Sequence, residues 1–226
     1  MGKHGYKARI ASNTVLFMIT DLMRSRAALL VIASTFASAT FALGGTDGDA
    51  SSIETFDEPS RFDLAIETAY LKSFFNPPRH YEISASFLTA RMRWGTNLNN
   101  EGLFRGYHQV YFSFLAEPIL RGIENHYYGV NAGFRYNLVR HRSRFVPFFS
   151  AGVGLGWIDS QPQVYSGQGQ DFTFNIVGAL GVSYQFSDRF SGQAGLLYQH
   201  FSNGGITDPN PSLNLLGLQL GFTRSF

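Results

Sequence analysis

The segment "DFTFNIVGALGVSYQF", residues 171–186, alternates between two kinds of side chain along almost its whole length. Successive side chains of a β-strand point to opposite faces of the sheet, so this alternation predicts a strand with one apolar and one polar face. The apolar set is Phe172, Phe174, Ile176, Leu180, Val182, Tyr184 and Phe186, and the polar set is Asp171, Thr173, Asn175, Ser183 and Gln185.

The same two-residue period recurs in seven further segments. They are residues 62–70, 81–87, 108–114, 127–138, 145–157, 190–202 and 213–226. Most of them are long enough to cross a bilayer when tilted. We therefore predict an all-β fold, an eight-stranded antiparallel transmembrane β-barrel of the bacterial outer membrane. In this prediction the apolar set of each strand faces lipid, and that includes Ile83, Ala85 and Phe87.

The composition favours the same class of protein. Charged residues make up only 15% of the chain, with 22 Phe, 11 Tyr and 24 Gly, whereas soluble globular domains usually contain about 25% charged residues. A soluble lipocalin-like barrel would place the bulky apolar set inside, and we expect the narrow lumen of eight strands to be too small for it. Arg135 lies on the polar face of its segment, and we expect it to pair with Glu67, Glu82 or Glu117 inside the barrel.

The N-terminal region predicts export from the cytoplasm. Residues 1–42 contain an apolar run preceded by two arginines and followed by small residues, which indicates a signal peptide, and Met23 is an alternative start. Residues 43–60 are expected to be a flexible polar lead-in, and residues 61–226 the barrel. Five of the 18 basic and one of the 16 acidic residues lie in 1–42, so the remainder has a net charge of −2. This charge gives no support for nucleic-acid binding.

The segment "YQHFSNGGITDPNPSLN", residues 198–214, interrupts the alternation with polar residues. His200 and Ser202 share the lipid-facing side of one strand, and by the same parity Asn214 shares that side of the next. The simplest explanation is that strands become polar where they leave the bilayer. The alternative is catalysis, because a serine hydroxyl is a weak nucleophile unless a base such as histidine accepts its proton. Gly204 and Gly205 would let backbone N–H groups approach an oxyanion.

This segment resembles the H-x-S-N-x-G motif of the PagL family, outer-membrane lipid A 3-O-deacylases. The signal peptide, the eight strands and the place of the motif between the last two strands also match. The resemblance implies that His200 is the general base and Ser202 the nucleophile. It further implies an oxyanion region formed and supported by Asn203, the Gly205 backbone and Asn210.

The third member of the triad departs from the family pattern. The family has Glu fourteen residues after the histidine, where this chain has Asn214. An asparagine can orient an imidazole, as Cys-His-Asn enzymes show, but it supplies no negative charge. Asp208 is the alternative acid. We expect Leu196 and Tyr198 to line the groove for the substrate.

The sequence thus predicts a serine esterase that removes the ester-linked acyl chain at position 3 of lipid A in the outer leaflet. No metal or cofactor is expected, since the chain has no cysteine and the motif carries its own nucleophile. The alternatives are a non-enzymatic structural or adhesive outer-membrane barrel and an outer-membrane phospholipase. Lipid A is the expected partner, nucleic acid is not, and the sequence indicates no oligomeric state.

Overall fold

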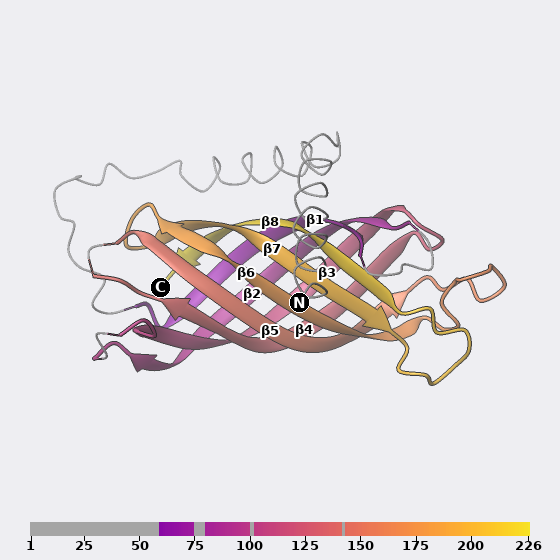
Figure 1. Ribbon diagram of the computed structural model, residues 1–226, viewed down its shortest axis with the longest axis horizontal. Helices are drawn as coiled ribbons and strands as arrows, with labels where there is room; N and C mark the ends of the chain where they lie inside the picture. The colour runs from indigo at the N-terminus through magenta and orange to yellow at the C-terminus, as the bar shows by residue number, and fades with distance from the viewer. Residues whose placement is uncertain (1–58, 75–79, 100–101, 142) are drawn as a thin grey trace, which may run out of the picture.

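Eight antiparallel strands form a closed barrel in which each strand pairs with the next and β8 pairs with β1 (Figure 1). The computed structural model describes residues 59–74, 80–99, 102–141 and 143–226. The strands are β1 (Phe62–Ser73), β2 (Glu82–Asn97), β3 (Gly106–Arg121), β4 (His126–Leu138), β5 (Phe145–Ile158), β6 (Phe172–Gln185), β7 (Phe190–Ser202) and β8 (Leu213–Ser225). These strands confirm the predicted fold.

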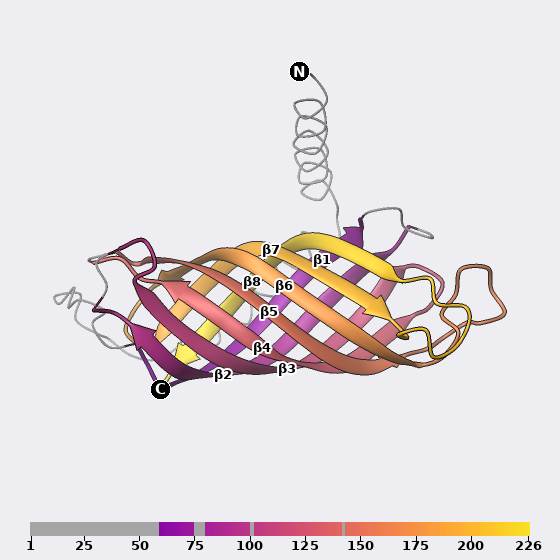
Figure 2. The same ribbon diagram turned by 60° about the horizontal axis from the view of Figure 1, so that its bottom comes forward.

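The two ends of the barrel differ. Pro59 and Phe226 lie at one end, called here the terminal end, and the connections 159–171 and 203–212 extend from the other, called here the loop end (Figures 1 and 2). The expected signal peptide, Met23 and nearly all of the expected lead-in lie outside the described residues. In the described part of the chain, no helix is long and apolar enough to cross a membrane.

The outer face of the barrel is apolar, with large exposed side chains on six strands and half-buried leucines on β7 and β8. Large apolar side chains are exposed on β1 to β6, among them Ile66, Leu88, Phe114, Phe134, Val153 and Leu180. A continuous exposed apolar band of this kind is unfavourable in water and is typical of a surface that contacts lipid tails.

Aromatic contacts lie at both ends of this outer face, where girdles flank the apolar band of membrane barrels. Near the terminal end, the ring of Tyr184 lies 4.9 Å from that of Phe145 and 5.5 Å from that of Phe186. The loop-end belt consists of Trp157, Phe172 and Phe174; the ring of Phe172 lies 5.9 Å from that of Trp157 and 5.3 Å from that of Phe174. The loop-end belt therefore marks the height at which β5 and β6 leave the apolar region.

Polar side chains fill the half of the lumen nearer the terminal end. Glu67 forms a buried ion pair with Arg91, and its carboxylate also accepts hydrogen bonds from Thr89 and Gln193, each at 2.6 Å. A buried charge is tolerated only when it is paired and hydrogen-bonded, and Glu67 satisfies both conditions. This network joins β1 to β2 and β7 across the inside of the barrel.

The expected pairing of Arg135 with a glutamate is wrong. Its guanidinium donates to Asn137 Oδ1 at 2.9 Å, to Ser183 Oγ at 2.8 Å and to Gln193 Oε1 at 2.8 Å. Gln193 in turn donates to Glu67, so the amide of Gln193 lies between Arg135 and Glu67 and is hydrogen-bonded to both. Neutral oxygens from three strands satisfy the guanidinium instead.

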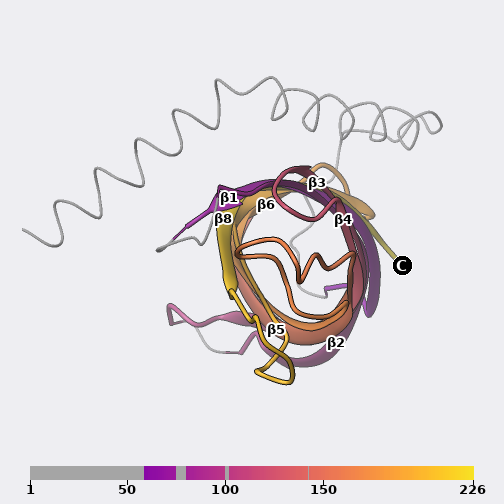
Figure 3. The ribbon, with the colours of Figure 1, turned by 90° about the vertical axis from the view of Figure 1, so that its right-hand side faces the viewer.

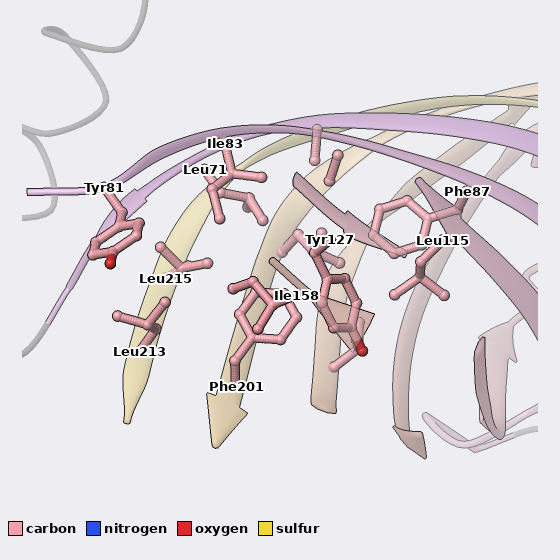
Figure 4. Packing of buried hydrophobic residues seen from close by; sticks show 14 residues of the cluster. Leu71, Tyr81, Ile83, Phe87, Leu115, Tyr127, Ile158, Phe201, Leu213 and Leu215 are labelled. Carbon is pink, nitrogen blue, oxygen red and sulfur yellow. The ribbon is translucent and has the colours of Figure 1, made fainter. Parts of the chain in front are cut away.

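A cluster of buried apolar side chains occupies much of the half of the lumen nearer the loop end (Figure 4), beside buried polar groups such as Glu117 and Gln199. Its buried side chains come from all eight strands and from Tyr81, just before β2. The labelled members are Leu71, Tyr81, Ile83, Phe87, Leu115, Tyr127, Ile158, Phe201, Leu213 and Leu215. The rings of Tyr127 and Phe201 lie 4.5 Å apart. The expectation that the lumen is too narrow for bulky apolar groups is therefore wrong for this half.

The same cluster corrects the orientation of the first half of β2. Ile83, Ala85 and Phe87 were expected to face lipid, but they are buried inside the barrel. They share a face with Thr89 and Arg91, which also point inward. The predicted alternation is correct, but the apolar face of this segment points into the lumen instead of toward lipid. The apolar cluster in the lumen near the loop end favours apolar side chains on the inner face.

Connections at the loop end close this apolar region. The segment between β5 and β6 lies across the opening of the barrel (Figure 3), and its residue Gln168 is fully buried. Glu124, between β3 and β4, accepts hydrogen bonds from the Gln168 backbone N–H at 2.8 Å and from the Tyr81 hydroxyl at 2.5 Å. The lumen is thus a packed interior, covered at the loop end by these connections.

Candidate active site on the outer wall

The pairing of β7 with β8 brings His200 opposite Asn214. The two are direct Cα partners, and Tyr198 is the partner of Leu216 two positions nearer the middle of the barrel. The intervening residue Gln199 is fully buried in the lumen, so the alternating side chains at 198, 200 and 202 lie on the outer side. The predicted outward orientation of His200 and Ser202 is confirmed. The register also shows which residues of β7 and β8 face each other.

The imidazole of His200 is hydrogen-bonded to the side chain of Asn214. Nδ1 of His200 lies 3.0 Å from Oδ1 of Asn214. An amide oxygen only accepts hydrogen bonds, so this contact requires the proton on Nδ1 and leaves Nε2 as an acceptor. An Nε2 lone pair is what a general base needs in order to take a proton from a hydroxyl. Asp208 has no hydrogen bond to His200 among the described residues.

Ser202 follows His200 on the same face at the end of β7. Two residues of a strand span roughly 6.5–7 Å, and in the described chain no hydrogen bond joins Ser202 Oγ to the imidazole. Catalytic hydrogen bonds are commonly long in unliganded enzymes and shorten when substrate binds. The structure therefore brings His200 together with Asn214, and leaves Ser202 beside the pair as its strand neighbour.

The connection after Ser202 is organised by the side chain of Asn203, which is fully buried. Its Oδ1 accepts from the Gly205 N–H at 2.9 Å, and its Nδ2 donates to the carbonyl oxygens of Thr207 at 2.6 Å and Pro209 at 3.4 Å. Gly204 and Gly205 have φ angles of +68° and +76°, which residues with a Cβ rarely adopt. The turn therefore depends on both glycines and on one amide side chain.

These contacts decide which donors near Ser202 are free. The expected oxyanion donor Gly205 N–H is already bonded to Asn203, and both Nδ2 contacts of Asn203 are internal to the turn. Asn210 uses Oδ1 to accept from the Asn203 N–H at 3.0 Å. In the part of the chain that the structure describes, the Gly204 N–H and the Asn210 Nδ2 group have no hydrogen-bond partner.

The site lies at the height of the loop-end aromatic belt. Ser202 is the direct partner of Phe174 on β6, and His200 is the partner of Ile176. Leu196 lies on the same outer side of β7, between Leu180 of β6 and Leu218 of β8. His200 and Ser202 are half-buried. The polar groups thus stand where the apolar outer wall meets the aqueous side.

The surface beside Tyr198 has an opening on β6. Gly178 is the direct partner of Tyr198, and a Cβ added to Gly178 would have only the Ser150 carbonyl oxygen within 4.0 Å. Within the described residues, no three His, Asp or Glu side chains are grouped so that they could hold a metal ion.

One contact of the site could not be read from the sequence. The hydroxyl of Tyr198 donates a hydrogen bond of 2.7 Å to Oδ1 of Asn214, the same oxygen that His200 contacts. The sequence indicates only that Tyr198 shares a face with His200. The contact depends on the β7–β8 register. Because the connection between the two strands is long, the sequence does not determine this register.

Comparisons with known proteins relate the chain to one family. Residues 79–223 match the family described as Lipid A 3-O-deacylase (PagL). Lipid A deacylase PagL of Bordetella bronchiseptica is 40% identical over 55 residues, which are 21% of this chain and 30% of that protein, so the match spans less than a third of the relative's length.

Two solved structures share the fold. The crystal structure of the outer membrane enzyme PagL superposes with a TM-score of 0.53 and 16% identity, covering 70% of this chain and 97% of that one. Neisserial surface protein A superposes with a TM-score of 0.53 and 15% identity, covering 75% and 100%. The eight-stranded outer-membrane barrel is common to all three.

Proposed function

Because the chain belongs to the Lipid A 3-O-deacylase (PagL) family, we propose that it hydrolyses the ester bond of the acyl chain at position 3 of lipid A. The reaction takes place in the outer leaflet of the bacterial outer membrane. The observation that carries the proposal is the His200 Nδ1–Asn214 Oδ1 contact of 3.0 Å on the outer wall, beside Ser202.

The height of the site suits an ester of a membrane lipid. The ester groups of such a lipid lie between its polar head and its acyl chains, at the boundary of the apolar region. Ser202 pairs with Phe174 of the loop-end belt, which marks that boundary on the barrel. A lipid can therefore present its ester to Ser202 while its acyl chains stay in the bilayer.

Ser202 and His200 carry the chemistry of acyl transfer. Ser202 Oγ attacks the ester carbonyl carbon while its proton passes to Nε2 of His200. The tetrahedral intermediate then collapses, and the sugar hydroxyl leaves with that proton. The acyl-enzyme at Ser202 is hydrolysed by water, which His200 activates in the same way, and the fatty acid is released.

The oxyanion of each tetrahedral intermediate needs donors close to Ser202. The Gly204 N–H and Asn210 Nδ2 are without partners among the described residues and lie in the connection that begins at Ser202. Preorganised donors of this kind account for a large part of catalysis in acyl transfer. The Gly205 N–H and Asn203 support the turn that presents these donors.

Asn214 takes the place of the acid. Its amide oxygen holds the Nδ1–H tautomer of His200, as an asparagine does in Cys-His-Asn enzymes. It adds no full negative charge to balance the imidazolium that forms during proton transfer. The chain should therefore work more slowly than a variant with a carboxylate correctly placed at this position.

The acyl chain binds along the outer wall of β6 to β8. Leu196 lies beside Leu180 and Leu218, and Tyr198 lies beside the opening at Gly178. Apolar side chains on three neighbouring strands form a surface that an acyl chain can follow toward the middle of the bilayer. Tyr198 precedes His200 on the outer side of β7, and Leu196 lies beyond Tyr198 toward the middle of the barrel.

Expression in a lipid A-producing bacterium tests the proposal. Mass spectra of lipid A from cells with the wild-type chain should show loss of one 3-hydroxyacyl chain, and cells with Ser202→Ala should retain it. Phospholipids from the same cells should be unchanged. Loss of acyl chains from phospholipid alone would indicate a phospholipase, and unchanged lipids of both kinds would indicate a barrel without this enzymatic function.

A further inference from the structure

Oδ1 of Asn214 accepts two hydrogen bonds at once. One comes from His200 Nδ1 at 3.0 Å and the other from the Tyr198 hydroxyl at 2.7 Å. An amide oxygen has two lone pairs, so both are used. All three side chains lie on the outer wall, where an unpaired polar group is unfavourable.

An asparagine at this position has a weakness that a carboxylate does not have. Its amide can rotate by half a turn, which places Nδ2 toward His200. Nδ2 only donates, so the rotated amide requires Nδ1 to accept and moves the ring proton to Nε2. In that tautomer Nε2 cannot take a proton from Ser202. The orientation of one amide therefore decides whether His200 can act as a base.

The Tyr198 hydroxyl favours the productive orientation. Its proton has no acceptor other than Asn214 Oδ1 among the described residues. If the amide rotated, Nδ2 would face the hydroxyl, and the phenolic proton would be left without a partner on an apolar surface. Leaving a donor unsatisfied in such a place is unfavourable. The hydroxyl and the imidazole thus both require an oxygen at the same point.

We propose that Tyr198 is a positioning residue that holds the amide oxygen of Asn214 toward His200 and so fixes the Nδ1–H tautomer. Tyr198 acts through Asn214 and does not react with substrate. Its kinetic part rests on the proposed function. The tautomer of His200 can be measured without any substrate, so it does not rest on the proposed function. An experiment can therefore contradict the role of Tyr198 and the proposed function independently.

The kinetic test uses the symmetry of a carboxylate. In Asn214→Asp both side-chain oxygens accept, so no orientation remains for Tyr198 to select. Tyr198→Phe should lower kcat about tenfold in the wild-type chain and less than about twofold in Asn214→Asp. The control is Tyr184→Phe, which removes a hydroxyl from the outer wall near the terminal end and should leave kcat unchanged. Equal losses in both backgrounds, or none in either, would overturn the proposal.

Nitrogen NMR of the refolded, ¹⁵N-histidine-labelled protein in detergent micelles tests the tautomer without any substrate. The His200 signals are identified by their loss in His200→Gln. The wild-type chain should show the Nδ1–H form, Tyr198→Phe should gain the Nε2–H form, and Asn214→Asp should stay in the Nδ1–H form with or without the Tyr198 hydroxyl. An unchanged tautomer in Tyr198→Phe contradicts the proposal even if the protein hydrolyses no ester. A correct tautomer without hydrolysis contradicts the proposed function alone.

Discussion

His200 and Asn214 face each other across β7 and β8, and the imidazole Nδ1 lies 3.0 Å from the amide Oδ1. The contact lies on the outer wall of a barrel whose interior is packed. It gives a histidine on a lipid-facing surface a defined tautomer, and it does so beside a serine. The geometry therefore favours a reaction on a lipid that stays in the membrane.

The first prediction concerns Asn214, the third member of the proposed triad. Asn214→Ala removes the hydrogen bond that orients His200, so kcat on purified lipid A in detergent should fall about tenfold, the equivalent of roughly 1.4 kcal/mol. Asp208→Ala is the matched control, and its kcat should stay within about twofold of wild type because Asp208 has no described hydrogen bond to His200. The opposite ranking of these two variants would make Asp208 the acid.

The second prediction separates the two sides of the Asn210 amide. Asn210→Asp keeps an oxygen to accept from the Asn203 N–H, which is 3.0 Å from Oδ1, but replaces the free donor with a second acceptor. If Nδ2 stabilises the oxyanion, kcat should fall about a hundredfold while KM changes little.

The control for this prediction is Asp208→Asn, which changes the charge of the same connection without removing a donor and should remain active. A fully active Asn210→Asp would leave the Gly204 N–H as the main oxyanion donor.

The third prediction tests the path of the acyl chain. A Leu side chain at Gly178 has open space around its Cβ, so the barrel should fold normally while the opening beside Tyr198 is filled. Gly178→Leu should lower kcat/KM about tenfold for a long-chain ester and have less effect on a short-chain ester. Ala116→Leu, on the outer face of β3, is the control. Equal kinetics for all chain lengths would place the acyl chain elsewhere.

The fourth prediction concerns the polar half of the lumen. Arg91→Met leaves the buried Glu67 carboxylate without its charged partner, so the free energy of unfolding should fall by about 3 kcal/mol. Lys72→Met breaks the partly exposed ion pair between Lys72 Nζ and Glu82 Oε1, which are 3.8 Å apart. This change should alter the free energy of unfolding by less than about 1 kcal/mol. Urea unfolding in lipid vesicles, followed by tryptophan fluorescence, measures both.

The fold could be predicted from the sequence because lipid on one side and a side-chain-filled lumen on the other impose a period of two on every strand. The direction of the pattern was harder to predict. Ile83, Ala85 and Phe87 alternate correctly, yet they point inward because they join an apolar cluster inside the lumen near the loop end. Thr89 and Arg91 could have indicated the inward orientation. They are polar and lie on the same face of the strand as Ile83, Ala85 and Phe87, and both are buried.

The site could be predicted only in part for a related reason. The spacing of His200 and Ser202 lies within one strand and is visible in the sequence. Their relation to Asn214 depends on cross-strand register, which alternation alone does not determine. The shared oxygen of Asn214, with Tyr198 as its second donor, follows from that register and needed the structure.

The most direct test of the central claim is mass spectrometry of purified lipid A after incubation with the purified, refolded protein. The wild-type chain should remove a single ester-linked 3-hydroxyacyl chain from position 3 and release one fatty acid for each lipid A converted. Ser202→Ala, which keeps the His200–Asn214 contact, should release none. Release of the same fatty acid by Ser202→Ala, or intact lipid A after incubation with the wild-type chain, would contradict the account.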